Sequence, residues 1–143
     1  ETATEARAIA SDMVARGTRK ARIFTRDLEP LLYNNREFET GLMHLLRSNP
    51  HSHCQVLIQD SGDLFSIDHR LLAVNQRLSS YMEVRQVPEE AADELRNFLL
   101  VDGGSYLLRP NSGSYHGVAS LDDPSTVRDL DRSFRQWWEQ SSP

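Results

Sequence analysis

The sequence predicts an α/β fold with a mixed, mostly parallel sheet that is sandwiched by helices. Predicted strands alternate with predicted helices through the first half of the chain, which is the arrangement of βαβ units. The segments "QVLI" and "FLLV" are almost continuously apolar, as expected of strands that are covered on both faces. The 143 residues fit one compact domain, residues 1–143, with an N-terminal helix over 1–18 and an α/β core over 19–143.

Hydrophobic spacing predicts each element in chain order. The segment "TEARAIASDMVAR" carries apolar side chains at helical spacing and precedes Gly17, a typical helix stop. A strand over 21–25 and a turn-rich link around Pro30 follow. The segment "REFETGLMHLLRSN" is helical and ends at Asn49-Pro50, and "HCQVLIQD" is the second strand.

The second half of the chain is predicted to contain more strands than helices. The segment "LFSIDHRLLAVNQRLSS" predicts an amphipathic helix with Ile67 on its apolar side, and "YMEVRQV" predicts the third strand. Pro88 and the acidic "EEAADE" form a solvated connection. Two strands, "NFLLVD" and "SYLLRP", and a sixth, "YHGVAS", precede the last helix, "DDPSTVRDLDRSFRQWWEQ". Asp122 or Asp123 can cap that helix, and only one of Trp137 and Trp138 can point fully inward.

Composition excludes several classes of protein. A net charge of −5 argues against general nucleic-acid binding, although it leaves room for a small basic pocket. The single Cys54 rules out an intrachain disulfide and a cysteine-based zinc cluster, and His51 and His53 lack a third metal ligand at a suitable spacing. No apolar run approaches the roughly 20 residues that span a bilayer. We therefore expect a protein with no cofactor, no metal and no membrane contact. No signal peptide is visible, and a chain that begins at Glu1 rather than Met is typical of a piece of a longer protein.

The segment "LRNFLLVDGGSYLLRP" combines an apolar strand, an Asp-Gly pair and a second strand, and "FRQWWEQS" follows as a terminal helix. This order resembles one half-unit of the phospholipase D superfamily, in which a strand carries H-x-K-x-x-x-x-D-G. Counted back from Asp102, the histidine position holds Leu95 and the lysine position holds Asn97. A leucine cannot attack phosphorus, and a neutral amide is a poor substitute for an ammonium group. The resemblance therefore implies the fold and argues against the chemistry of the family.

The segments "IFTRDLEPLLYNNREF", "HRLLAVNQRLSS", "EVRQV" and "FLLVDGGSYLLR" together are similar to a small bacterial domain of uncharacterised function. That domain has a phospholipase D-like fold and occurs alone or behind an acetyltransferase domain. The resemblance implies a cytoplasmic accessory domain with a fused or separate acetyltransferase as a partner. The likeness to a phospholipase D half-unit also implies a homodimer, because a half-unit alone would find its second half in another copy. The pair Trp137-Trp138 and the apolar "YLLRP" strand offer a surface for this contact.

Candidate binding residues follow from the rule that ligands bind beyond the carboxyl ends of parallel strands. We expect these ends to bring together Arg26, Asp27, Tyr33, His69, Arg70, Arg85, Asp102 and Arg109. Arginines at such ends suit a phosphate or carboxylate, because a guanidinium offers two parallel donors. Two interpretations remain open, an anion-binding pocket and a network of Arg–Asp pairs that holds the loops. Asp102 likewise either belongs to the pocket or accepts backbone N–H groups in the Gly103-Gly104 turn.

The sequence thus favours a non-catalytic phospholipase D-like module that binds an anionic small molecule or serves as an accessory or regulatory domain. The alternative is a phosphodiesterase or nuclease that uses His69 or His116 in a rearranged site.

Overall fold

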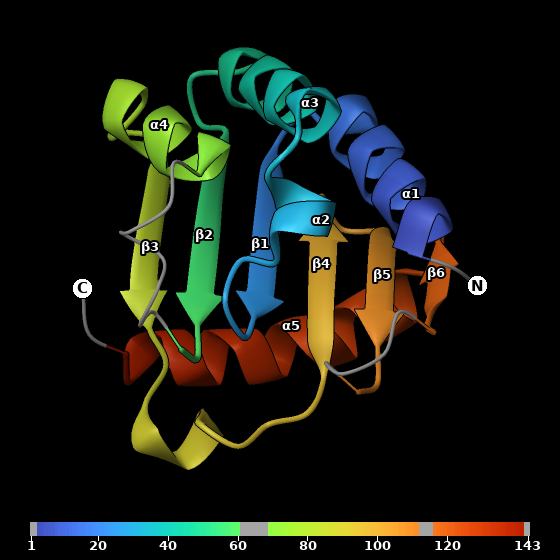
Figure 1. Cartoon of the computed structure of the whole chain (residues 1–143), viewed down its shortest axis with the longest axis vertical. Helices are drawn as coiled ribbons and strands as arrows, with labels where there is room; N and C mark the ends of the chain where they lie inside the picture. Colours follow the sequence, from blue (N-terminus) through green and yellow to red (C-terminus); the bar gives the residue numbers. More distant parts are fainter. Residues whose placement is uncertain (1–2, 61–68, 112–115, 142–143) are drawn as a thin grey trace.

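The computed structural model of the chain describes residues 3–60, 69–111 and 116–141. A six-stranded sheet with the order β3-β2-β1-β4-β5-β6 forms its centre (Figure 1). The strands are β1 (Lys20–Thr25), β2 (His53–Ile58), β3 (Met82–Gln86), β4 (Asn97–Val101), β5 (Ser105–Arg109) and β6 (Val118–Ser120). The helices are α1 (Ala3–Arg16), α2 (Pro30–Tyr33), α3 (Arg36–Arg47), α4 (Arg70–Arg77), the 3₁₀ helix η2 (Glu89–Ala91) and α5 (Pro124–Glu139).

The helices cover both faces of this sheet. Helices α1 to α4 pack on one face, in a core that includes Ile23, Val56 and Leu99. Helix α5 packs on the other face, where Phe134 meets Phe24 and Phe98 in a second core. The alternation of side chains along each strand assigns these residues to the two faces. The predicted α/β class, a mixed sheet sandwiched by helices, is confirmed.

The direction of the strands divides the sheet into two halves. Strands β1, β2 and β3 are parallel, whereas β4 pairs antiparallel with β1 and β5, and β5 pairs antiparallel with β6. The parallel arrangement is therefore confined to the first three strands. The expectation that β4 runs parallel to β1 is wrong, and Figure 1 shows β4 running back along the sheet.

Local sequence explains the helix ends. The Asn35 side chain accepts a hydrogen bond from the Phe38 N–H and caps α3, and the Asp123 side chain caps α5 ahead of Pro124. Gly17 follows α1 as predicted, but it does not adopt the left-handed conformation of a helix stop. A Cβ atom at Gly17 would lie 2.5 Å from Leu45 Cδ1, so close packing explains this glycine.

Several finer expectations change. The link around Pro30 contains α2, and the acidic connection contains η2. Both tryptophans are half-buried, and Trp137 stacks on Phe24 while Trp138 stacks on Phe134. The "YLLRP" strand is not an exposed surface, because β5 lies between β4 and β6.

Some predicted residues fall outside the part of the chain that the structure describes. They are Ile67 in the predicted second amphipathic helix and Tyr115 at the start of the predicted sixth strand. Within the described ranges, no helix combines the length and the apolar character needed to cross a bilayer.

Candidate anion-binding site

The reversal of β4 separates the residues that we expected to share one site. The parallel strands bring Arg26, Gln59 and Gln86 to one edge of the sheet, which we call the carboxyl edge. Asn97 begins β4 at this edge, and Asp102 follows β4 at the opposite edge, which we call the amino edge. Five residues of extended chain place Asn97 and Asp102 roughly 16 Å apart. The predicted crevice shared by Arg26, Arg85 and Asp102 is therefore wrong.

Asp102 ties the β4–β5 turn to the start of β1. Its carboxylate accepts the backbone N–H groups of Thr18 at 3.3 Å, Arg19 at 2.9 Å and Lys20 at 3.1 Å. Its own N–H donates to the Lys20 carbonyl, and its φ of 54° is left-handed. Asp102 thus accepts backbone groups, as one interpretation held, but from residues 18–20 rather than from its own turn.

The carboxyl edge contains a buried ion pair. Arg109 ends β5, is 2% exposed and forms a salt bridge with Glu29 at the start of α2. Burial raises the pKa of Glu29, and the hydrogen bond from Arg109 opposes that rise. Burial, followed by the charge of Glu29, raises the pKa of the nearby Tyr33. Because Glu29 neutralises Arg109, this guanidinium is poorly suited to bind an additional anion.

The two motif positions that hold the nucleophilic histidine and the lysine in the phospholipase D superfamily also lie at this edge. In this chain they are Leu95 and Asn97. The buried Asn97 side chain accepts the Arg26 N–H at 3.1 Å, and its Nδ2 has no hydrogen-bond partner within the described part of the chain. Leu95, at the histidine position, is 57% exposed. Among the described residues no partner contacts the Arg26 guanidinium, which is exposed beside the exposed Asp27. One cation beside one carboxylate is a weak attraction for an anion.

His69 has a structural role. Its side chain is 2% exposed, its Nε2 donates to the Leu28 carbonyl at 2.8 Å, and its Nδ1 accepts the Leu71 N–H at 3.1 Å. These bonds cap α4 and require the neutral imidazole with a proton on Nε2. Burial lowers the pKa of His69. The Leu28 backbone that it holds is left-handed, with a φ of 55°.

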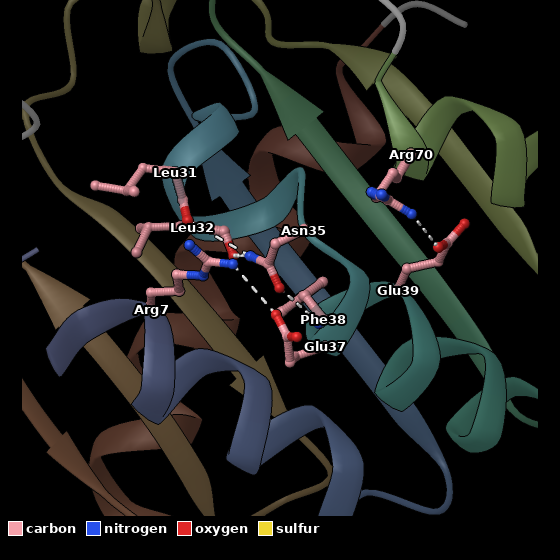
Figure 2. Close-up of polar contacts among 8 residues, drawn as sticks. All are labelled: Arg7, Leu31, Leu32, Asn35, Glu37, Phe38, Glu39 and Arg70. Atoms are coloured by element: carbon pink, nitrogen blue, oxygen red, sulfur yellow. Dashed lines mark hydrogen bonds and ion pairs between the residues drawn. The ribbon is translucent and has the colours of Figure 1, made fainter. Parts of the chain in front are cut away.

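Two further arginines of the predicted site are paired elsewhere. Arg70 and Glu39 point toward one another at 3.0 Å, and Figure 2 shows this contact near the Asn35 cap of α3. Arg85 donates to Glu83 at 2.7 Å and stacks 4.4 Å above the Trp138 ring. The network of paired charges therefore describes Arg70, Arg85 and Arg109 better than a shared anion pocket does.

A different cavity lies at the amino edge. A pocket of about 410 Å³ is lined by Arg19, Lys20, Asn49, His51, Ser52, His53, Asp102 and Gly103. A second pocket of about 200 Å³ is lined by Lys20, Asp102, Gly103, Pro124, Val127, Arg128 and Asp131. Because the pockets share Lys20, Asp102 and Gly103, they adjoin, and we call them together the amino-edge groove.

Three cations, Arg19, Lys20 and Arg128, and two carboxylates, Asp102 and Asp131, line the amino-edge groove. The described residues include no hydrogen-bonded or ion-paired partner for the side chains of Arg19, Lys20 and Arg128. The Asp102 carboxylate is occupied by three backbone N–H groups, and burial, followed by the charge of Arg22, lowers the pKa of Lys20. The Lys20 ammonium group and the guanidinium groups of Arg19 and Arg128 have no hydrogen-bond acceptor among the described residues. Such donors are suited to an anion such as phosphate.

Sequence reasoning missed Arg19, Lys20 and Arg128. The sequence does contain a signal that could have found them. The connection between Gln86 and Asn97, which joins β3 to β4, is short and contains no crossover helix. A parallel β4 needs such a crossover, so a short connection favours an antiparallel β4 and places its Asp-Gly turn beside residues 18–20.

Comparison with protein families gives one match. The model described as "Domain of unknown function (DUF7931)" matches residues 2–143. The chain belongs to the DUF7931 family. Comparison with curated proteins gives no match.

Many solved structures share the fold of this DUF7931 domain, and two of them are TrmBL2 and NucT. TrmBL2, an archaeal chromatin protein with a novel mode of DNA binding, has a TM-score of 0.71 and 10% identity over 99% of this chain and 51% of its own. The chain thus spans about half the length of TrmBL2. NucT from Helicobacter pylori has a TM-score of 0.63 and 10% identity over 98% of this chain and 91% of its own. The likeness to NucT fits the phospholipase D-like fold that the sequence suggested.

The comparison with TrmBL2 corrects one expectation. We expected no general nucleic-acid binding because the net charge is −5. That exclusion is wrong, because the same fold occurs in a chromatin protein that binds DNA. The physical reason is that net charge sums over the whole surface, whereas a phosphate responds to the charges within about 10 Å of it.

Proposed function

We propose that this DUF7931 domain is a non-catalytic phospholipase D-like module that binds a phosphate-bearing anionic ligand in the amino-edge groove. One observation carries the proposal. The carboxylate of Asp102, which lines both pockets, is held by three backbone N–H groups, so Arg19 and Lys20 face the 410 Å³ pocket without a carboxylate partner among the described residues. A phosphate would supply the acceptors that these cations lack.

The sequence motif supports the absence of catalysis. Leu95 and Asn97 occupy the positions of the nucleophilic histidine and the lysine in the family motif. The Asn97 carboxamide is buried and bound to the Arg26 N–H, so it does not replace an ammonium group that neutralises phosphoryl oxygens. An accessory or regulatory role beside a catalytic domain, such as an acetyltransferase, fits a module that binds without turnover.

A phosphodiesterase or nuclease is the second candidate, and the likeness to NucT favours testing it. His69 is a poor nucleophile here, because both of its ring nitrogens are bound to the backbone and its side chain is 2% exposed. His116 is exposed, so it is the better candidate for the nucleophile of a phosphodiesterase or nuclease. We expect no hydrolysis of bis-(p-nitrophenyl) phosphate above background. Turnover that disappears in His116→Ala would contradict the non-catalytic assignment.

The likeness to TrmBL2 makes DNA a ligand to test. A labelled oligonucleotide, in single-stranded and duplex form, would be titrated with the protein at two salt concentrations while its fluorescence anisotropy is followed. Contact with the groove predicts an affinity that falls as salt rises, because bound phosphates release counterions. It also predicts weaker binding by Lys20→Gln than by wild type.

Calorimetric titration with tripolyphosphate at low ionic strength tests the proposal itself. We expect Arg19→Gln and Lys20→Gln each to weaken binding about five- to tenfold, because each removes a charge-assisted contact. The backbone tie to Asp102 survives both changes, since it uses main-chain N–H groups. Arg132→Gln is the matched control, because it removes the same charge from an exposed position on α5 outside the groove. Equal affinities of wild type and both groove variants would refute the proposal.

A further inference from the structure

We infer that the ligand of the amino-edge groove is a linear chain of several phosphate groups that runs through both pockets past Lys20. This inference rests on the proposed function, since it names the class of ligand for the same groove. It goes further because it assigns the second pocket, which a single phosphate would not need.

The arrangement of the lining residues carries the inference. Arg19 lines only the 410 Å³ pocket, Arg128 lines only the 200 Å³ pocket, and Lys20 lines both. The three cations therefore follow one path from the end of the α3–β2 connection, around the start of β1, to the first turns of α5. A single orthophosphate in either pocket contacts the cations that line that pocket, whereas an anion that extends through both pockets contacts Arg19 in one and Arg128 in the other.

The carboxylates along this path are already occupied. Asp102 accepts three backbone N–H groups. Asp131, in the second pocket, forms salt bridges with Arg22 and with Arg135. Asp123, next to Pro124, accepts hydrogen bonds from the N–H and the hydroxyl of Thr126. The cations of the path are therefore available to a chain of phosphates, while its carboxylates are bonded to other groups of the protein.

A chain of linked phosphates suits a path that has cations in both pockets. Linked phosphates make the second and third contacts intramolecular, so their combined affinity exceeds that of one phosphate without any new type of contact. Phosphoanhydride and phosphodiester chains share this feature. Both present consecutive phosphate groups, each of which carries one negative charge along the chain.

Calorimetry with four probes tests the inference: orthophosphate, tripolyphosphate, long-chain inorganic polyphosphate and a base-free deoxyribose phosphodiester oligomer. We expect the two long chains to bind more tightly than orthophosphate. Arg128→Gln should weaken binding of the chains about five- to tenfold and lower the salt dependence of their binding by about one ion, while orthophosphate binding stays unchanged. Arg132→Gln should bind every probe as the wild type does.

The outcomes separate the inference from the proposed function. If orthophosphate and the chains bind equally and Arg128→Gln behaves as Arg132→Gln does, the inference is overturned and single-phosphate binding stands. If no probe binds, both are overturned. Binding of only the polyphosphate or only the phosphodiester oligomer supports the inference and identifies which chain the groove accepts.

Discussion

Asp102 holds three consecutive N–H groups with one carboxylate, and this bond set fixes the start of β1 against the β4–β5 turn. A carboxylate is suited to this role because it offers two acceptor oxygens and forms a charge-assisted hydrogen bond with each donor. The left-handed backbone of Asp102 is a conformation that Asp and Asn tolerate better than other residues with a side chain. The same residue therefore shapes the floor of the groove, and its carboxylate oxygens are bonded to the backbone rather than to Arg19 or Lys20 side chains.

We predict that Asp102→Ala lowers the free energy of unfolding by about 1–3 kcal/mol, because the N–H groups lose their acceptor and alanine is strained at this φ. Asp102→Asn should cost less, since the amide keeps one acceptor oxygen and tolerates the left-handed conformation. Urea denaturation of both variants measures the difference. An alanine variant as stable as wild type would show that the tie contributes nothing.

The buried His69 predicts a stability that depends on pH. Its pKa is lowered in the folded protein from an ordinary value of 6.5, so the unfolded chain binds more protons as the pH falls. The stabilisation is present above pH 6.5 and is lost progressively below it. His69→Asn keeps a side chain that can cap α4 and removes the titration.

We therefore expect the free energy of unfolding of wild type to fall more between about pH 7.5 and about pH 5.5 than that of His69→Asn. This interval lies above the ordinary titration range of carboxylates. The difference between the two proteins also removes the opposite contribution of Glu29, whose raised pKa favours the folded state as the pH falls. Identical pH profiles would contradict the role assigned to His69.

Among the elements, α1 and α3 approach closely where Gly41 faces α1. A Cβ atom at Gly41 would lie 2.9 Å from Val14 Cγ1 and 3.1 Å from the Ala15 nitrogen. The second of these neighbours is backbone, so the contact cannot be relieved by a change of rotamer alone. The glycine thus sets the distance between the helices that cover one face of the sheet.

We predict that Gly41→Ala lowers the free energy of unfolding by about 1–2 kcal/mol, even though alanine favours a helix by about 1 kcal/mol over glycine. Gly103→Ala is the matched control, because a Cβ atom there has no neighbour within 4 Å and the backbone is not left-handed. Thermal or urea unfolding compares the two variants. A Gly41→Ala protein that gains stability would show that the helices can separate at little cost.

Strand β4 shows where element-level reasoning failed. The apolar run "NFLLV" identified a strand, and every one of its residues is buried. Its hydrophobicity cannot give its direction, because a strand covered on both faces is equally apolar in either orientation. The direction was fixed by the connection from β3, whose only regular element is a three-residue 3₁₀ helix.

For the whole molecule, the sequence predicted the layers well and the binding site poorly. The periodicity of "REFETGLMHLLR" and of the last helix located α3 and α5, because amphipathic spacing is a local property. The site depends on which strand ends meet, which is a property of the topology. Pairings such as Arg109 with Glu29, 80 residues apart, leave no local signal in the sequence.

Net charge failed for a related reason. The chain carries a charge of −5, yet the amino-edge groove gathers Arg19, Lys20 and Arg128 with its two carboxylates already bonded. The sum over the surface hides such a local excess. The central claim for the whole molecule is therefore that anions bind at the amino edge and not at the carboxyl edge, where the family motif would place chemistry.

Backbone amide chemical shifts during a titration with tripolyphosphate test this claim most directly. We predict that the amides of Arg19, Lys20 and Gly103 shift progressively and saturate, while those of Arg26, Asn97 and Arg109 stay in place. In Lys20→Gln the shifts at the amino edge should shrink. Saturable shifts confined to the carboxyl edge, or no saturable shifts at either edge, would show that anions do not bind in the amino-edge groove.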